Sequence, residues 1–310
     1  MTLSETIALS YLLGIASKKL YRFVDYTGED LIQRLMESSL TIKEEGESVP
    51  IGKTHIEQAF AYAQKVIERS QAEGIQFLLY VDEAYPEILR RTTNERGDLT
   101  PPVLLYAKGD LSVAKEPCIA IAGTRHPSPE GMAAAKHLAE DFVKEGLAVV
   151  SGLALGCDTA AHEGALAAKG KTVAFLAHGL HMVTPTENIG LAKRIVENGG
   201  LLLSEYPVGM SFSKYSFISR DRLQAGLSRA TVVVQTDKNG GSMHVANATL
   251  MSQKPLYSVY FQDERTRALE ISQGNDYLVK KGAKYLSVTD DLHAVAQSIL
   301  NKPSFPTTLF

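Results

Sequence analysis

The sequence predicts an α/β protein with a mostly parallel sheet covered by helices on both faces, preceded by a small helical N-terminal subdomain. Two observations carry this prediction. From residue 117 onward, short apolar or β-branched runs alternate with stretches of helical periodicity, whereas the first seventy-odd residues show helical spacing without strand signals. The 310 residues suffice for one large α/β unit or for a large domain with a smaller companion.

The N-terminal subdomain is expected to be helical because apolar residues recur three and four positions apart around Leu3, Leu20 and Leu31. Within it, residues 12–20 (LLGIASKKL) look like a helix-hairpin-helix turn, a motif whose backbone amides hold a DNA phosphate. The second glycine of such a hairpin is missing. The alternative is an ordinary pair of packed helices, since glycine is common at helix ends.

The remaining chain supplies the strands and helices of the sheet. Runs at residues 76–82 and 102–110 predict two strands joined by a polar loop. Seven further runs predict a mostly parallel sheet: CIAIA, LAVVS, TVAFLA, LLLSE, ATVVVQ, PLYSVY and the weaker KYLSV. Helices are expected near residues 129–145, 158–169, 187–198, 218–228, 241–253 and 290–300.

The composition is that of a folded globular protein, with 45% hydrophobic and 22% charged residues. A net charge of −3 does not drive binding to nucleic acid or membrane, so any site for a polyanion must be a local patch. Cys118 and Cys157 lie far apart, which disfavours a disulfide framework or a cysteine zinc site and fits a reducing compartment. Because the N-terminus lacks a signal-peptide pattern, we expect a cytoplasmic protein that does not contact membranes.

Three loops that follow predicted strands are rich in glycine, serine and threonine. They contain Gly123-Thr124-Arg125, residues 151–156 (SGLALG) and residues 239–242 (NGGS). In an open parallel sheet, ligands bind beyond the carboxyl ends of the strands, where backbone amides and helix dipoles meet an anion. A single such loop also serves plain turns, but three of them predict one phosphate site. None matches a dinucleotide or Walker fingerprint, so we expect no nucleotide cofactor and disfavour ATP hydrolysis.

Arg125 and the segment 211–230 supply candidate cations. The planar fork of Arg125 suits a phosphate, and the alternative is a solvated loop arginine. The segment contains four cations and a single acid, Asp221, and three aromatic residues are interleaved with the cations. This pattern suits a site where bases stack on the rings and the cations bind the backbone. The alternative is that Phe217 is a core anchor and the arginines form a solvated helix face. The cations and rings are Lys214, Arg220, Arg222, Arg229, Phe212, Tyr215 and Phe217.

Asp158 and His162 lie four positions apart at the start of a predicted helix, which suits an acid–base pair or metal ligands. We favour the alternative that Asp158 caps the helix and His162 bonds nearby backbone, because no nucleophile or second ligand cluster accompanies them. We therefore assign no catalytic residue and no metal ligand. His178 and His181 fit a strand-end loop equally well as turn residues or as ligand contacts.

Taken in order, several motifs resemble those of the DprA/Smf family, the bacterial DNA-processing proteins that bind single-stranded DNA and help load the RecA recombinase. They run from about residue 76 to 286: DEAYPEILR, PPVLLYAKGDL, IAIAGTRHPSPEG, VVSGLALGCDTAAHEGAL, LSEYPVG, FISRDRLQAGLS, GGSMHVANATL and GNDYLVKKGA. The resemblance implies an extended Rossmann-like DNA-binding domain over residues 73–310. For residues 1–72 it implies a helical subdomain similar to SAM or helix-hairpin-helix domains.

The resemblance also implies a DNA groove lined by the three loops, by the late arginine motif and by an asparagine after the third strand. Combined with Lys214 and Phe217, the predicted DNA and phosphate site is Gly123, Thr124, Arg125, Ser151, Gly152, Leu153, Asn188, Lys214, Phe217, Arg220, Arg222, Gly240, Gly241 and Ser242. Three positions depart from the family pattern: Leu155 replaces an arginine, Asp221 an asparagine and Thr184 a tyrosine. The first two exchanges weaken phosphate binding, because a charge-assisted contact contributes about 1.5–3 kcal/mol. We expect no C-terminal winged helix.

The expected function is non-enzymatic binding of single-stranded DNA in recombination, transformation, or a mobile-element or defence process, without a cofactor. RecA is a possible partner. The alternative is a Rossmann-like protein that binds or hydrolyses nucleotide derivatives, for which Asp158, Glu187 and Glu205 are the nearby candidate bases and Glu205 is the best.

The family resemblance further implies a homodimer. Large amphipathic rings near the end of the sheet suit such an interface, because tyrosine buries ring area and keeps a polar tip. The alternative is that these rings pack internally against the last helix. The rings are Tyr257, Tyr260, Tyr277 and Tyr285.

Overall fold

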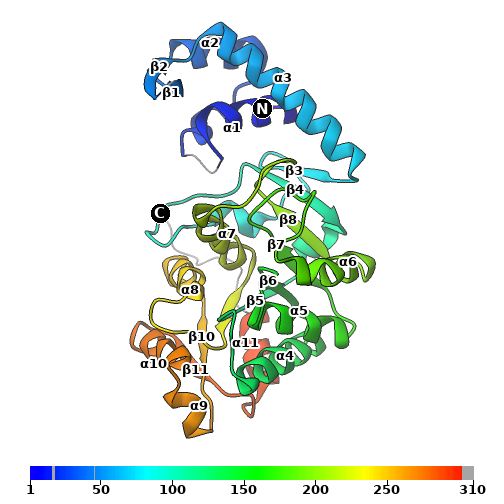
Figure 1. Cartoon of the computed structure of the whole chain (residues 1–310), viewed down its shortest axis with the longest axis vertical. Helices are drawn as coiled ribbons and strands as arrows, with labels where there is room; N and C mark the ends of the chain where they lie inside the picture. The colour runs from blue at the N-terminus through cyan, green and yellow to red at the C-terminus, as the bar shows by residue number, and fades with distance from the viewer. Residues whose placement is uncertain (16–17, 45, 302–310) are drawn as a thin grey trace.

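The structure is a computed structural model, and it describes residues 1–15, 18–44 and 46–301. Within these residues, a nine-stranded sheet has the order β11-β10-β9-β5-β6-β7-β8-β4-β3 (Figure 1). The strands from β11 to β8 run parallel, β4 is antiparallel to β8, and β3 is antiparallel to β4. The predicted α/β fold with a mostly parallel sheet is confirmed.

Every apolar run predicted to be a strand of the sheet is one. All residues of the six strands from β5 to β10 are buried, which explains why their sequences are continuous apolar runs. The strands are β3 (Gln76–Leu79), β4 (Leu104–Gly109), β5 (Cys118–Ala122), β6 (Ala148–Ser151), β7 (Thr172–Phe175), β8 (Leu201–Ser204), β9 (Ala230–Val233), β10 (Leu256–Val259) and β11 (Lys284–Leu286).

The six helices predicted between the strands are also present: α4 (Pro129–Lys144), α5 (Cys157–Ala167), α6 (Ile189–Glu197), α7 (Lys214–Leu227), α8 (Ser242–Met251) and α11 (Leu292–Leu300). Two short helices, α9 (Glu264–Ala268) and α10 (Gln273–Lys280), were not predicted. Helix α7 begins four residues before the expected position because Ser213 and Ser216 form a capping box, in which each hydroxyl accepts from the other residue's backbone N–H. No helix in the described ranges is long and apolar enough to cross a membrane.

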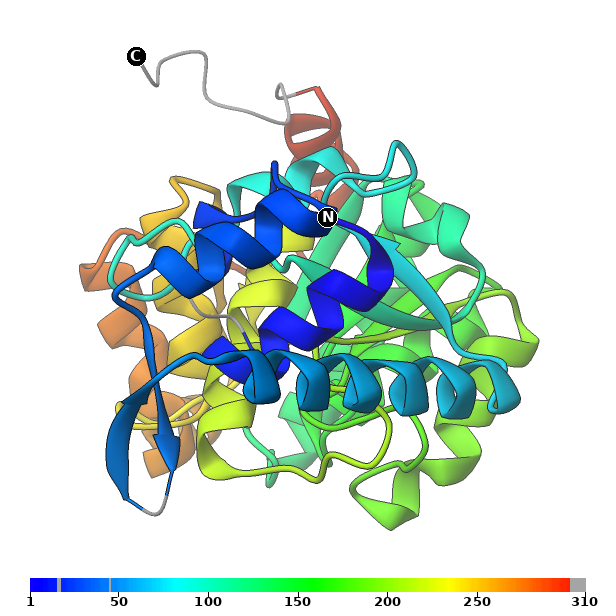
Figure 2. The ribbon, with the colours of Figure 1, turned by 90° about the horizontal axis from the view of Figure 1, so that it is seen from above.

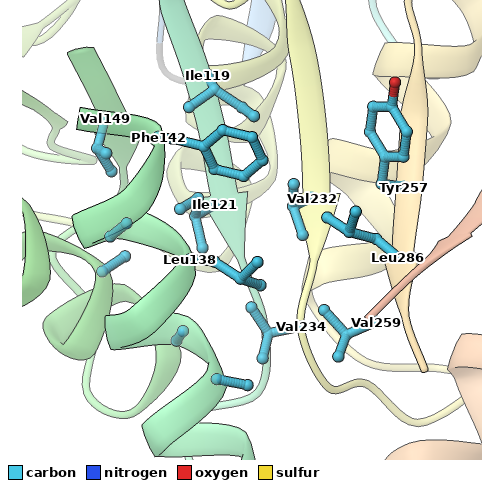
Figure 3. Packing of buried hydrophobic residues seen from close by; sticks show 14 of the residues in the cluster. Ile119, Ile121, Leu138, Phe142, Val149, Val232, Val234, Tyr257, Val259 and Leu286 are labelled. Atoms are coloured by element: carbon cyan, nitrogen blue, oxygen red, sulfur yellow. The ribbon is translucent and has the colours of Figure 1, made fainter. Parts of the chain in front are cut away.

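Helices cover both faces of the sheet. Side chains of α4, α5 and α11 pack with alternate residues of β5, β9 and β10 on one face, and α6 continues this layer over β7 and β8. The intervening strand residues pack on the other face against α7, α8 and α10. Figure 3 shows the first layer, where Phe142 of α4 lies against Ile119 and Ile121 of β5.

The predicted helical N-terminal region is confirmed, but it also contains two strands that no strand signal in the sequence indicates. The region has three helices, α1 (Leu3–Leu13), α2 (Gly28–Glu37) and α3 (Lys53–Ala72). Between α2 and α3 the chain forms a two-stranded antiparallel hairpin of β1 (Thr41–Glu44) and β2 (Glu47–Pro50). The hairpin projects from the side of the molecule (Figure 2). Its residues are mostly exposed, so no alternating apolar pattern marks it in the sequence.

The N-terminal helices have a small core of their own, centred on Leu9, Leu31 and Ile56. They also pack on the sheet, because α1 and α3 share a second cluster with β4 and α6. The domain boundary at residues 72 and 73 stays a prediction. Residues 16 and 17 of the predicted helix-hairpin-helix turn, and residues 302–310 of the C-terminal tail, lie outside the described residues.

Phe142 provides a test of the main core. We expect Phe142→Ala to lower the free energy of unfolding by about 3–5 kcal/mol, because it leaves a cavity beneath α4. Met132→Ala on the same helix is the control, since Met132 is 40% exposed and its loss changes stability by less than about 0.5 kcal/mol. Urea unfolding at equilibrium measures both values. Similar stability losses in the two variants would contradict this assignment of the core.

Candidate nucleic-acid interface

The strand order reverses at β5, which lies between β6 and β9. The chain moves outward from β5 through β6, β7 and β8, and then returns to β9 on the other side of β5. The loops after β5 and β9 therefore separate and leave a crevice at the carboxyl ends of the strands, the usual ligand site of open α/β sheets. A cavity of about 730 Å³ lies there, and we call it the groove.

Segments far apart in the sequence meet in the groove. The loop after β5, the first half of α7 and the loop before α8 form its walls. Nine of the fourteen predicted site residues line it: Gly123, Thr124, Arg125, Lys214, Phe217, Arg220, Gly240, Gly241 and Ser242.

Cations and aromatic rings lie together at the rim of the groove. The Arg125 guanidinium carbon is 5.2 Å from the centre of the Phe217 ring, and the Phe217 ring lies 5.6 Å from that of Phe212. Arg125 is exposed, as is Lys214, the first residue of α7. A cation over a ring next to a second ring suits a chain of phosphates and stacked bases.

Arg220 lies at the base of the groove and is buried. Its Nη1 donates to the carbonyl oxygens of Gly152 (2.5 Å) and Phe175 (2.7 Å), and its Nε lies 3.0 Å from an Asp221 carboxylate oxygen. Glycine at position 152 leaves room for the Arg220 guanidinium, which a Cβ there would overlap. Arg220 thus joins α7 to the ends of β6 and β7.

The loop after β6 does not line the groove with its predicted residues. The Ser151 hydroxyl donates to the Ile121 carbonyl oxygen at 2.7 Å, and the side chain of Leu153 is fully buried. The Asn188 side-chain amide donates to the carbonyl oxygens of Leu153 (2.9 Å) and Ala154 (3.3 Å). These contacts hold the shape of the loop.

The Asp158 carboxylate also holds this loop. It accepts the backbone N–H groups of Gly152 (3.1 Å) and Ala154 (3.3 Å). Four predicted site residues, Ser151, Gly152, Leu153 and Asn188, therefore belong to the support of the groove, and direct contact of these four with DNA stays a prediction.

Arg222 lies away from the groove. Its guanidinium forms a bidentate ion pair with Glu205, at 2.7 and 2.8 Å, and both side chains are buried. Its Nε also donates to the Thr100 carbonyl oxygen at 3.2 Å. Arg229 donates to the Leu300 carbonyl oxygen, so the predicted basic segment does not present one continuous cationic face. A DNA contact of Arg222 stays a prediction.

Two buried carboxyl groups offset the charge of Arg220. Burial raises the pKa of Asp221 to about 6, an effect that Arg220 opposes and Asp158 reinforces. Burial also raises the pKa of Asp158, again against the effect of Arg220. The positive charge that the groove offers to a bound anion therefore comes mainly from Arg125 and Lys214.

The histidines near the strand ends have structural contacts. The Thr172 hydroxyl donates to the Val149 carbonyl oxygen, so it accepts from Nδ1 of His162, whose pKa burial lowers to about 3. His178 donates to the Gly179 carbonyl oxygen, and His181 accepts the N–H of Gly209. All three thus serve local structure.

Sequence reasoning did not assign Gln224 and His244 to the site, although both line the groove. Gln224 donates to an Asp221 carboxylate oxygen at 3.2 Å, and Nδ1 of His244 lies 2.7 Å from a Glu95 carboxylate oxygen. Gln224 lies four residues after Arg220 and His244 three residues after Gly241. This spacing of one helical turn from a predicted site residue is the signal that points to them.

Comparison with known proteins gives the family. Residues 76–297 match the family described as DNA recombination-mediator protein A. The chain is 32% identical to the DNA processing protein DprA of Bacillus subtilis over 208 residues, which cover 67% of this chain and 68% of that protein. It is 34% identical to Protein Smf of Synechocystis over 197 residues, 62% of this chain but about half (48%) of that protein.

Two solved structures are similar. DprA of Streptococcus pneumoniae superposes with a TM-score of 0.66 at 28% identity, covering 79% of this chain and 82% of that one. DNA processing protein A of Helicobacter pylori, whose structure gives insights into its single-stranded DNA binding mode, superposes with a TM-score of 0.60 at 31% identity, covering 73% of this chain and 95% of that one. The chain therefore belongs to the DNA recombination-mediator protein A family, the DprA/Smf family that its motifs resemble.

Proposed function

We propose that this protein binds single-stranded DNA in the groove and acts as a recombination mediator that catalyses no reaction itself. The observation that carries the proposal is the cluster of Arg125, Phe217 and Phe212 beside the exposed Lys214, at the point where the strand order reverses. Exposed cations hold a phosphate backbone, and neighbouring rings stack bases of any sequence. The described single-stranded DNA binding of the Helicobacter relative supports the same ligand class here.

The biological partners follow from the family as further proposals. A recombination mediator delivers single strands to a recombinase, so a RecA-type recombinase is the proposed protein partner. Recombination, transformation and defence against or maintenance of mobile elements all supply such strands. The groove itself does not discriminate among these sources.

The alternative is a protein that hydrolyses a small nucleotide derivative, which requires a positioned general base. Two of the candidate bases have structural partners: Glu205 is bound to Arg222, and Asp158 accepts two backbone N–H groups. The third, Glu187, is exposed and does not line the groove. Affinity for an oligothymidylate against a panel of mononucleotides and cyclic nucleotides separates the two functions. Turnover of any nucleotide, with no affinity for the oligonucleotide, would favour the hydrolase.

Cations at the rim give a test through salt dependence. We expect Arg125→Ala and Lys214→Ala each to weaken binding of unstructured strands about tenfold for all sequences, because each removes one charge-assisted phosphate contact. Each change lowers the slope of log affinity against log salt by about 0.7. Fluorescence anisotropy titrations at several salt concentrations measure both effects. Lys136→Ala, an exposed lysine on α4, is the matched control, and equal affinities in all three variants would refute the assignment.

Asp221 gives a test through pH. Its carboxyl group has a pKa of about 6, so lowering the pH from 7 to 5 adds a proton and removes a negative charge beside the bound phosphates. We expect affinity for single strands to rise as pH falls through this range. Asp221→Asn binds more tightly than the parent at pH 7, by roughly tenfold, and has a smaller pH dependence. The parent and the variant differ only at this residue, so the difference between their pH dependences isolates Asp221.

Titration of Asp221 also changes the stability of the folded protein. Because the pKa of Asp221 is higher in the folded protein than its ordinary value of 3.8, ionisation of this group lowers stability as pH rises through about 6. Asp221→Asn is therefore expected to keep its stability at pH 7. An unchanged affinity in a stably folded variant would show that the carboxylate does not oppose DNA.

The proposed homodimer uses the edge of the sheet at β11. Tyr285 and Tyr277 are 45% and 37% exposed there, whereas Tyr257 is buried in the core. We expect light scattering to give a dimeric mass at micromolar concentration, and Tyr277→Ala combined with Tyr285→Ala to give a monomer. The parent dimer also gains affinity as the strand lengthens enough to reach both grooves. A monomeric parent without this gain would leave the dimer unsupported.

A further inference from the structure

A second cavity, of about 320 Å³, lies beside the groove between α7, α8 and the loop that contains Arg96. We name it the flanking cavity. We propose that the flanking cavity takes a further nucleotide of the bound strand, with its base stacked on Tyr215. This inference rests on the proposed function, because it extends the path of a strand already held in the groove.

The two cavities adjoin each other. Ile218 of α7 and His244 of α8 line both of them. On α7, Lys214, Phe217 and Asp221 line the groove, whereas Tyr215, Ser219 and Arg222 line the flanking cavity. Residues three and four apart share a helix face, so α7 presents two adjacent faces to the two cavities. A DNA strand that passes over the first turn of α7 therefore contacts Lys214 in the groove and then Tyr215 in the flanking cavity.

Tyr215 is available for stacking. Its side chain is 82% exposed, the largest exposed fraction among the large hydrophobic side chains of the described residues. An aromatic ring on the first turn of a helix loses little side-chain entropy when a base covers it, since it has only two rotatable bonds. The ring follows directly on Lys214, and a cation next to a ring is the pairing that single-strand sites repeat.

The opposite wall of the flanking cavity is held in place. The Asn94 side-chain oxygen accepts the backbone N–H groups of Arg96 (2.9 Å) and Asp98 (3.0 Å), and Asp98 forms an ion pair with Lys18. Nδ1 of His244 lies 2.7 Å from a Glu95 oxygen at the junction of the two cavities. The loop that faces Tyr215 is therefore tied to both α8 and the N-terminal subdomain.

The charged side chains of the flanking cavity do not repel a DNA strand. Arg222 is neutralised by Glu205, and the exposed Arg96 offsets Glu95. The local charge is therefore close to balanced, and stacking on Tyr215 supplies most of the affinity. This property separates the flanking cavity from the groove, where Arg125 and Lys214 supply the electrostatic attraction.

The test compares Tyr215→Ala and Tyr215→Phe in the full-length protein, with oligothymidylates of increasing length. We expect Tyr215→Ala to leave the affinity for the shortest strands that bind unchanged, and to weaken the affinity for longer strands about tenfold. Tyr215→Phe keeps the ring and binds like the parent at every length. Tyr11→Ala, a 53% exposed tyrosine of α1, is the control for loss of a surface ring. Fluorescence anisotropy measures all four proteins.

A second readout detects the stack directly. A strand with one 2-aminopurine, moved along the sequence, loses fluorescence when that base stacks on a ring. We expect one position at which the fluorescence is quenched in the parent and in Tyr215→Phe and recovers in Tyr215→Ala. If Tyr215→Ala binds every length like the parent, or loses the same factor at every length, the inference is wrong.

Failure of the inference differs from failure of the proposed function. If Arg125→Ala weakens binding while Tyr215→Ala does not change it at any length, the groove binds DNA and the flanking cavity does not. If the parent binds no strand of any length, both proposals fail together.

Discussion

The groove depends on the contacts of one buried cation, Arg220. A buried guanidinium needs several polar partners, because a buried charge without hydrogen-bond acceptors carries a large desolvation cost. Here the carbonyl oxygens of Gly152 and Phe175 and the carboxylate of Asp221 supply them. These partners come from the ends of β6 and β7 and from α7 itself. Helix α7 therefore stays pressed against the carboxyl ends of the strands, and its first turn lies over the loop after β5.

The supporting residues explain why so much of the predicted site is buried. Asp158 and Asn188 hold the backbone of the loop after β6 from two sides, which leaves its carbonyl oxygens facing Arg220 and Asn188. A loop held in this way positions other groups without contacting a ligand. The family motif around residue 151 thus describes the support for α7 as much as a surface for phosphate.

Helix α7 serves three environments at once. Leu223 and Leu227 pack in the core, Phe217 and Asp221 line the groove, and Tyr215 lines the flanking cavity. Because polar residues are buried along much of the helix, its apolar residues do not form one clean stripe. This is the physical reason why periodicity placed its start at residue 218, whereas the capping box at Ser213 begins it earlier.

The strands and helices of the main sheet can be predicted from the sequence, because strands buried on both faces must be continuous apolar runs and their crossover helices have regular spacing. The sequence also determined the family, and it brought the three glycine-rich loops to one edge. It missed the β1–β2 hairpin, since exposed strands leave no burial pattern.

The different roles of Arg220 and Arg222 depend on tertiary contacts, because the sequence pattern assigns both arginines to the same predicted site. Side chains two positions apart on a helix point about 200° apart around its axis. Arg220 and Arg222 therefore leave α7 on different sides. One meets the carbonyl oxygens at the base of the groove, and the other meets Glu205 on the side of the flanking cavity. Which partner each arginine finds depends on chain segments far away in the sequence, and local pattern carries no information about those distances.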